Sequence, residues 1–384
     1  MVAAVRSGSS MRRVARRFRV SLLTVQRWFH RAKGWRLDRM DFSDRPDGPR
    51  CGPHRFSRKM EDRVLTIRRQ LREESDLGEF GAAAIGRELL RLGRGPVPSL
   101  PTLNRILRRR GAFDSRCRVR RPAPPRGWYL PDVAAGRAEI DQFDIVSGLL
   151  IQGGPEVEVL NTISLHGGLV GSWPTAAINA KVVREVILRH WREFGLPDYA
   201  QFDNDTRFQG PHQHPDVISS VMRLCLSLKV VPLFVPPRET GFQATIESFN
   251  GRWQAKVWAR FHHESLEALE VQSAKYVAAC RKNGASRIES APQRRPFPKR
   301  WHLNLQAHPC GRMVFLRRTT EPGEVNLLGH SFLVDPLWPH RLVRCEVDLN
   351  QAVIRVYALR RREPKAQPLL RAIPYTWLFR RFRE

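Results

Sequence analysis

Cysteine is scarce in this chain, and long apolar runs are absent. The 384 residues include only six cysteines, and no two of them are spaced as CxxC. Structural zinc sites and disulfide frameworks use closer cysteines, so neither is expected, and a reducing cytoplasm fits. No segment approaches the roughly 18 consecutive apolar residues of a membrane span, and the N-terminus lacks the apolar run of a signal peptide. We therefore expect a cytoplasmic, nucleoid-associated bacterial protein with no membrane partner.

Lysine is also rare, although the chain is strongly basic. Only nine of the 66 basic residues are Lys, and the net charge is +29. Arginine favours forked contacts to phosphate groups. Residues 1–130 carry a surplus of 20 positive charges and residues 131–384 a surplus of nine, while residues 138–180 contain no Lys or Arg at all. This distribution predicts a front third that binds nucleic acid, followed by a segment kept free of cations.

The front third predicts a helix-turn-helix domain over residues 1–40. Ser9 and Ser10 can cap a helix from Met11 to about Arg17, and Ser21 can cap a second helix that ends at Gly34. The second helix would enter the DNA major groove with Thr24, Gln26, Arg27 and Arg31. An ordinary helical hairpin with a solvated basic face is the alternative. Because only Met1–Arg6 precedes Gly8, we also expect residues upstream of Met1 to complete a bracing helix.

An internal repeat predicts a second helical, helix-turn-helix-like DNA-binding domain over residues 54–115. The heptapeptide SLLTVQR at 21–27 recurs as SLPTLNR at 99–105, again after a helical segment. Its DNA-contacting candidates are Thr102, Asn104 and Arg105. Linkers rich in proline are expected at 41–53 and 116–126. Two such helices in tandem predict an extended DNA site.

Residues 130–290 alternate strand and helix patterns, which predicts an α/β core with a central sheet. Three acids occupy positions where such a core exposes side chains. Asp141 lies within the first strand, Asp203 at the tip of a later strand, and Glu247 on the first turn of a helix. Clustered carboxylates repel one another unless a cation neutralises them, and divalent ions such as Mg²⁺ prefer oxygen ligands. Two such ions can promote displacement at a phosphodiester.

Three segments carry a resemblance to a known family: EIDQFD around Asp141, GLPDYAQFDNDTRF around Asp203, and ATIESFNGRW around Glu247. They resemble bacterial insertion-sequence transposases whose catalytic core is of the retroviral-integrase (DDE) type. The resemblance implies a ribonuclease H-like core in which Asp141, Asp203 and Glu247 are catalytic and bind two Mg²⁺ ions, or Mn²⁺. It also implies double-stranded DNA partners, namely element ends and target DNA, and a homo-multimer assembled on DNA.

The chain departs from the family pattern at two places. Asp205 stands where the family has Gly, and 43 residues separate Asp203 from Glu247, more than is usual. Asp144 is the alternative to Asp141, three residues on and therefore on the opposite strand face. On the last helix Asn250 shares the face of Glu247, and Asn250, Arg252 and Lys256 are candidates for binding DNA.

Four strand-like segments between 302 and 372 predict a small C-terminal β-barrel, separate from the core. Taken together, the fold class is multidomain: helical N-terminal domains, a ribonuclease H-like α/β core, and this barrel. The function predicted is that of a DNA transposase that binds terminal inverted repeats, cleaves strands and transfers them. A non-catalytic, transposase-derived DNA-binding regulator would not need all three acids, and a ribonuclease H-like nuclease would gain little from two recognition helices.

Overall fold

The chain forms two compact units, Met1–Met60 and Glu61–Glu384. The computed structural model describes residues 1–43, 56–93, 95–112, 126–211, 214–239, 241–361, 363–378 and 381–382. Most of the two predicted linkers, 44–53 and 116–125, lies outside the described residues. Within the described ranges, no helix has the length and apolar character needed to cross a membrane.

The N-terminal unit is built from short helices whose ends follow the sequence signals. Ser10 and Ser21 both cap as predicted, because their side chains accept hydrogen bonds from the backbone N–H of Arg13 and Thr24. Arg19 ends the first of these two helices in the left-handed conformation, at φ 53°. The elements are α1 (Val2–Arg6), α2 (Met11–Phe18), α3 (Leu22–Ala32) and the 3₁₀ helix η1 (Leu37–Arg39), and their small core centres on Val14, Ala15 and Val25.

The internal repeat has a structural counterpart at the start of the second unit. The hydroxyl oxygens of Ser99 and Thr102 lie 3.0 Å apart, as those of Ser21 and Thr24 lie 2.8 Å apart in the first copy. Both pairs stand at the beginning of a helix. The helices of this region are α4 (Arg58–Glu74), α5 (Ala82–Arg91) and α6 (Leu100–Arg109), and Val64, Ile85 and Leu103 are buried between them.

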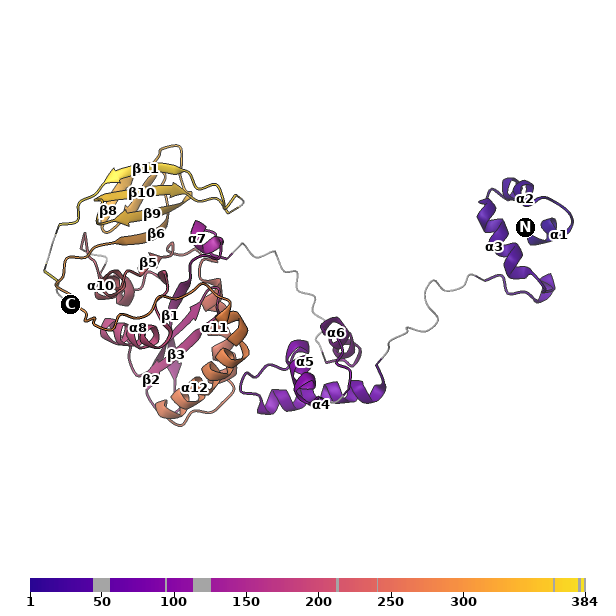
Figure 1. The fold of residues 1–384 in the computed structure, drawn as a ribbon, viewed down its shortest axis with the longest axis horizontal. Coiled ribbons are helices and arrows are strands. Elements are labelled where there is room, and N and C mark those ends of the chain that lie inside the picture. Colours follow the sequence, from indigo (N-terminus) through magenta and orange to yellow (C-terminus); the bar gives the residue numbers. More distant parts are fainter. Residues whose placement is uncertain are drawn as a thin grey trace. The chain divides into compact units, whose positions relative to one another are not determined.

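The rest of the second unit is built around a nine-stranded sheet, whose strands follow the order β11-β10-β9-β6-β5-β4-β1-β2-β3 (Figure 1). Strands β1, β4, β5 and β6 run parallel, and the pairs on either side of this central group are antiparallel. The strands are β1 (Ile140–Leu150), β2 (Glu156–Ser164), β3 (Val170–Thr175), β4 (Tyr199–Phe202), β5 (Val231–Phe234), β6 (Arg312–Arg318), β9 (Leu342–Asp348), β10 (Val353–Ala358) and β11 (Leu369–Pro374). A separate hairpin consists of β7 (Glu324–Leu327) and β8 (His330–Leu333).

Helices cover both faces of the sheet because alternate strand residues are apolar on both faces. One face packs on α8 (Ala180–Phe194) and α10 (Ser220–Ser227), with the short α9 (Thr206–Gln209) beside them. The other face packs on α11 (Ala244–Trp253), the π-helix η2 (Gln254–Trp258) and α12 (Leu266–Asn283). The remaining short helices are α7 (Pro131–Ala134) and α13 (Ala285–Glu289).

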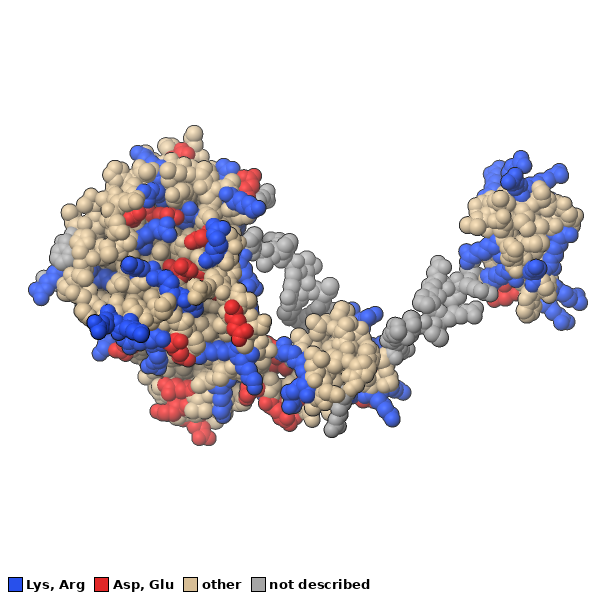
Figure 2. All heavy atoms as spheres, viewed as in Figure 1, with Lys and Arg blue, Asp and Glu red and all other residues tan. Residues whose placement is uncertain are grey.

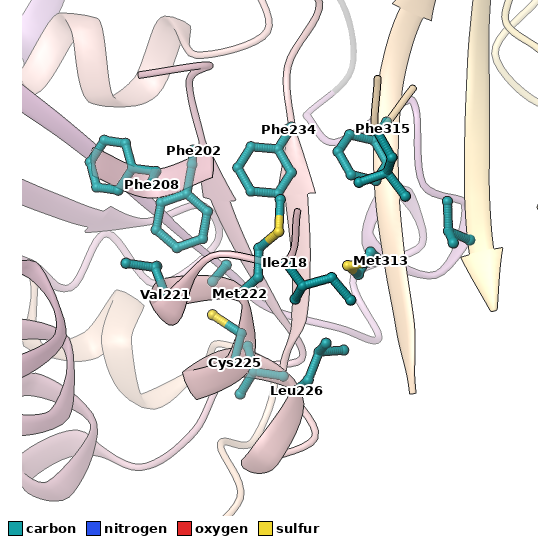
Figure 3. Packing of buried hydrophobic residues seen from close by; sticks show 14 of the residues in the cluster. Phe202, Phe208, Ile218, Val221, Met222, Cys225, Leu226, Phe234, Met313 and Phe315 are labelled. Carbon is teal, nitrogen blue, oxygen red and sulfur yellow. The ribbon is translucent and has the colours of Figure 1, made fainter. Parts of the chain in front are cut away.

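A row of phenylalanines ties the C-terminal strands to the core sheet. Neighbouring rings of Phe143, Phe202, Phe234 and Phe315 have centroids 5.3–5.8 Å apart, on β1, β4, β5 and β6 in turn. Figure 3 shows three of them side by side above residues of α10. The predicted separate β-barrel is therefore wrong. Alternating strand patterns do not specify which edge a strand joins, and here β6, β9, β10 and β11 extend the core sheet.

A buried ion pair fastens β1 to a segment far along the chain. Asp141 is fully buried, and Arg294 donates two hydrogen bonds to its carboxylate, at 2.8 and 2.6 Å. Trp191 of α8 donates a third, at 3.0 Å. Burial alone would raise the pKa of Asp141, but the charge and hydrogen bonds of Arg294 outweigh it and hold the pKa below its usual range. The pair is therefore charged, and each partner needs the other.

Removing Arg294 should destabilise the fold strongly. Arg294→Ala leaves Asp141 buried without its counter-charge, and such a change costs about 3–5 kcal/mol. Urea unfolding of the full chain measures this loss, with the exposed Arg300→Ala as the matched control, for which we expect no more than about 0.5 kcal/mol. Replacing both partners together, Asp141→Leu with Arg294→Met, should recover most of the stability. An Arg294→Ala protein as stable as the Arg300→Ala protein would contradict this assignment.

Candidate functional site

The register of two parallel strands brings two carboxylates together. Gln142 of β1 lies opposite Gln201 of β4, and the same register carried two residues further sets Asp144 opposite Asp203. Asp203 directly follows the last residue of β4, and Asp144 lies within β1 at the same level of the sheet. Neighbouring strands are about 4.8 Å apart, and side chains at i and i+2 share a face. Asp144 and Asp203 therefore stand side by side, on the face of the sheet that packs against α11.

Glu247 lies near this pair, on the first turn of α11, and is exposed; its charge adds to the raised pKa of Asp144. A buried network positions the start of this helix. The side-chain oxygen of Gln142 accepts a hydrogen bond from the backbone N–H of Ile246, at 3.1 Å, next to Glu247. The amide of Gln201 donates to the carbonyl of Phe242 at 2.9 Å, and the hydroxyl of Tyr129 donates to Gln201 at 2.6 Å. The strand below the acids thus also determines where Glu247 stands.

Asn250 orients Asp144. Its amide donates a 2.7 Å hydrogen bond to the carboxylate of Asp144, and its carbonyl oxygen accepts one of 2.9 Å from Asn161. Asn161 lies on β2 directly across from Asp144 and is fully buried. The backbone N–H of Ile145 donates to the other carboxylate oxygen of Asp144, at 3.0 Å. Both oxygens of Asp144 are therefore held in place from within the protein.

The electrostatics of this pair differ sharply from those of Asp141. Burial and the negative charge of Asp203 raise the pKa of Asp144 to about 6. Burial also raises the pKa of Asp203, although a hydrogen bond from the backbone N–H of Asp205 opposes this. Among the described residues, no ion pair with Lys or Arg involves either acid. Two poorly compensated carboxylates of this kind attract a cation.

Asp205, which replaces the family glycine, is not a third member of this pair. Its side chain accepts a hydrogen bond from the backbone N–H of Arg207 and so caps α9. Its charge is matched by the guanidinium of Arg207, at 2.7 Å, which also lies 2.6 Å from Glu158. Arg207 thus offsets part of the extra negative charge, while the charge of Asp205 still contributes to the raised pKa of Asp203.

The structure corrects the choice of first acid. The prediction grouped Asp141 with Asp203 and Glu247, but Asp141 faces α8 on the opposite side of the sheet and is paired with Arg294. Asp144 is the strand acid that shares a face with Asp203. The sequence contains both at positions compatible with the motif, and the strand period separates them onto opposite faces without stating which face α11 covers.

The residues fit a divalent cation only in part. Asp144 and Asp203 offer carboxylate oxygens, the ligands that Mg²⁺ prefers, with little opposing positive charge. Within the described part of the chain, however, no three histidine, cysteine, aspartate or glutamate side chains are grouped closely enough to hold a metal ion. The structure therefore does not assemble the predicted three-acid site: two acids are paired, and Glu247 is nearby.

The predicted DNA-contacting residues fall into two classes. Arg27, Asn104, Arg105 and Arg252 are exposed, while Thr24, Gln26, Arg31 and Thr102 are half-buried. Arg31 lies over the ring of Trp28 and donates to the carbonyl of Ser43 at 2.9 Å. Two expectations are corrected. Asn250 is buried and bonded to Asp144 rather than open to DNA, and Lys256 donates to the carbonyl of Gly78 at 2.9 Å.

Sequence reasoning missed the residues that hold the site together. Asn161 and Gln142 are polar residues inside otherwise apolar strands, and that contrast is a signal the sequence does carry. Arg294 was missed because its partner is 153 residues away, and nothing in the local pattern connects the two.

The raised pKa of Asp144 predicts a pH-dependent stability difference in metal-free protein. A carboxyl whose folded pKa is near 6 and whose unfolded pKa is near 4 binds its proton only in the folded state between these values. The charge of Asp144 therefore opposes folding at pH 8, and this cost disappears as the pH falls from 6 to 4. The free energy of unfolding of Asp144→Asn minus that of wild type should therefore be about 2–3 kcal/mol larger at pH 8 than at pH 4.

Urea unfolding at several pH values measures the difference. The exposed Glu289→Gln serves as the control, and its stability difference from wild type should stay nearly constant with pH. If the stability difference between Asp144→Asn and wild type also stays constant from pH 4 to pH 8, the pKa of Asp144 is not raised in the folded protein.

No protein-family model matches the chain, and no curated protein matches it. Solved structures do resemble it. A chain of the simian T-cell lymphotropic virus intasome in complex with PP2A regulatory subunit B56 gamma matches with 14% identity over 69% of this chain and 88% of that chain, at a TM-score of 0.35. The catalytic core domain of BIV integrase matches with 16% identity, covering 37% and 81%, at 0.28. The HTLV-2 integrase catalytic core domain in complex with magnesium matches with 14% identity, covering 40% and 86%, at 0.27.

Proposed function

We propose that this protein is a DNA transposase of the integrase type, which cuts DNA strands at element ends and joins them to target DNA. The observation that carries the proposal is the Asp144–Asp203 pair, which stands where β4 ends beside β1, with Glu247 nearby. Paired carboxylates with little counter-charge are suited to metal-assisted displacement at phosphorus. The N-terminal unit and helices α4–α6, which precede the core in the sequence, supply exposed basic side chains for DNA.

Asp144, Asp203 and Glu247 are the residues that would hold Mg²⁺ or Mn²⁺ in this proposal, and Asp141 is a structural residue. When bound, the metal supplies Lewis acidity and charge neutralisation for the attacking and leaving oxygens. Asn250 and the backbone of Ile145 fix the Asp144 carboxylate, while Gln142 fixes the start of α11. The reaction is a displacement at phosphorus by water, followed by attack of the freed 3′-hydroxyl on a second phosphodiester.

DNA binding in this proposal begins with the two repeated helices, α3 and α6. Figure 2 shows Lys and Arg side chains gathered around the N-terminal unit. Arg27 on α3, with Asn104 and Arg105 on α6, offers exposed polar side chains at matching positions of the repeat. Such side chains can reach base edges in the major groove. We propose that each helix reads a different part of one terminal repeat, and that the protein acts as a homo-multimer on paired ends.

Asp144→Asn should abolish strand cleavage and joining while end binding persists, because the amide keeps the shape but removes a charge that the metal needs. Asp203→Asn should behave the same way. The matched control is Asp141→Asn, which alters the strand acid on the opposite face. It should lose stability but still cleave at a temperature where it remains folded. The substrates are labelled duplexes of the proposed element ends, tested with Mg²⁺ by gel shift and by strand cleavage.

Two outcomes would reject parts of this proposal. Cleavage by Asp144→Asn at a near wild-type rate would remove Asp144 from the site. Loss of cleavage by a folded Asp141→Asn would restore Asp141 as the first acid. If wild type binds the ends tightly and cuts nothing, the protein is a DNA-binding regulator. Cutting without sequence preference and without joining would indicate a nuclease.

Variants on the two repeated helices should affect different parts of the DNA site. Gln26→Ala and Arg27→Ala should weaken binding to one segment of the repeat, and Asn104→Ala and Arg105→Ala to another. A lost base contact should cost about 1–3 kcal/mol and relax specificity, whereas a lost phosphate contact weakens all sequences alike. Footprinting and competition gel shifts measure both effects, with Arg36→Ala outside α3 as the control. If both pairs of variants lose protection of the same bases, the two helices do not read different parts of the repeat.

A further inference from the structure

A cavity of about 410 Å³ lies at the carboxyl ends of the parallel strands β4, β5 and β6. Asn204 comes soon after β4, Pro237 soon after β5, and Arg317 stands near the end of β6. In open sheets of parallel strands, ligands bind at this edge. The volume lies within the range of about 300–1,000 Å³ that is usual for small-molecule pockets.

The cavity is separate from the Asp144–Asp203 pair. Arg317 shares a strand face with Phe315, whose ring centroid lies 5.1 Å from the guanidinium carbon, and Phe315 packs on the α10 side of the sheet. The two acids lie on the α11 side. Among the described residues, the cavity lining contains no Asp or Glu. A ligand bound here would therefore be distinct from a metal held by the acids.

Arg317 is a buried cation without a carboxylate partner in the described part of the chain. It is 8% exposed, and burial lowers its pKa to about 10, so the side chain stays charged at pH 7. Buried charges are normally paired. Arg294 is paired in this way with Asp141, and Arg344 with Glu346. The fold thus leaves the charge of Arg317 uncompensated at a cavity wall.

Only Nη1 of the Arg317 guanidinium donates hydrogen bonds to described residues, namely to the carbonyls of Val235 and Leu316 at 3.1 and 2.9 Å. Nε and Nη2 have no such acceptor, yet they are not among the enclosed polar atoms that lack a partner. They therefore face accessible space, which is the cavity. Arg223 is similarly buried but shows the contrast, because three backbone carbonyls accept hydrogen bonds from its Nε and Nη1.

The free edge of the guanidinium suits a carboxylate. Nε–H and Nη2–H point the same way and form the fork that matches the two oxygens of a carboxylate. One guanidinium also matches its single negative charge, whereas free phosphate would need further cations or converging N–H groups. The rest of the wall has aliphatic surfaces that can cover a hydrocarbon chain, supplied by Pro211, Val217, Leu327 and Leu328.

We propose that this cavity binds a small aliphatic carboxylate, whose head group pairs with Arg317 and whose chain lies against Val217 and the leucines of the hairpin. The inference goes beyond the proposed function, because no step of DNA cleavage requires this ligand. Its carboxylate supplies the counter-charge that the described fold lacks. The carbonyl of Val235 accepts hydrogen bonds from both Arg317 and Asn204, so the ligand also stabilises the segment that follows Asp203.

Calorimetric titration of the full chain tests the proposal, with acetate, butyrate and hexanoate as probes and hexanamide as the neutral counterpart of hexanoate. Affinity should increase about fourfold for each added methylene group. Hexanamide should bind at least about tenfold more weakly than hexanoate, because it lacks the charge. Inorganic phosphate should also bind more weakly than hexanoate. Hexanoate, but not hexanamide at the same concentration, should raise the melting temperature.

Two variants locate the binding in the cavity. Arg317→Met removes the charge, so hexanoate should bind it no more tightly than hexanamide does. Asn326→Trp leaves Arg317 in place, sets a large ring at the exposed edge of the cavity, and should weaken hexanoate binding about tenfold. Leu333→Trp is the matched control on the hairpin, outside the cavity lining, and should bind hexanoate as wild type does.

Several results would overturn the inference. They are no binding of hexanoate by wild type at millimolar concentration, equal affinity for hexanoate and hexanamide, or tighter binding of inorganic phosphate than of hexanoate. Equal hexanoate affinity of Asn326→Trp and Leu333→Trp would also place the ligand elsewhere. None of these measurements uses DNA, so failure here leaves the transposase proposal standing, and failure of strand cleavage leaves the carboxylate site standing.

Discussion

The alternation of side chains along two adjacent parallel strands governs the functional half of this molecule. Once Gln142 pairs with Gln201, every following pair is determined: Phe143 stacks on Phe202 on one face, and Asp144 meets Asp203 on the other. The aromatic face, which packs on α8 and α10, continues through β5 and β6 and forms the main hydrophobic core. The opposite face presents first the amide side chains that hold α11 and then the acids. A shift of one residue in this register would bury the acids beneath α8 and turn the phenylalanines toward α11.

The two strand aspartates of the first motif illustrate how environment separates chemically identical groups. Asp141 receives two hydrogen bonds from Arg294 and one from Trp191, so its negative charge is satisfied and its pKa is depressed. Nearby His190 adds no fixed charge, since burial lowers its pKa to about 3. Asp144 faces another carboxylate and amide donors, so its pKa rises. The charge of Asp141 is compensated inside the protein by a stabilising ion pair. The charge of Asp144 has no such partner and stays available to attract a cation.

Much of the fold could be read from the sequence, and the limits have physical causes. Caps at Ser10 and Ser21, the repeated helix start at Ser99 and the strand–helix alternation of the core depend on local rules, and those predictions are confirmed as structural elements. The barrel was wrong because strand pairing is non-local: Phe315 meets Phe234 only through the register of β5 and β6. The choice of Asp141 failed because the helix over each face is set by packing, which the period of a strand does not specify. Arg294 and Asn161 act across long sequence separations, and local patterns cannot reveal such partners.

The exposed position of Glu247 follows from the same electrostatics. Burial and the charge of Asp203 raise the pKa of Asp144, and the charge of Glu247 already adds to this, so a closer approach of Glu247 without a cation would increase the repulsion. The protein instead places Glu247 on the first turn of a helix whose start is pinned by Gln142 and whose next turn, through Asn250, is pinned to Asp144. The backbone of α11 is thus fixed at both ends of this turn, while the side chain of Glu247 stays in solvent. The structure therefore combines a rigid scaffold with one exposed carboxylate, and in the proposed function a cation would draw the three acids together.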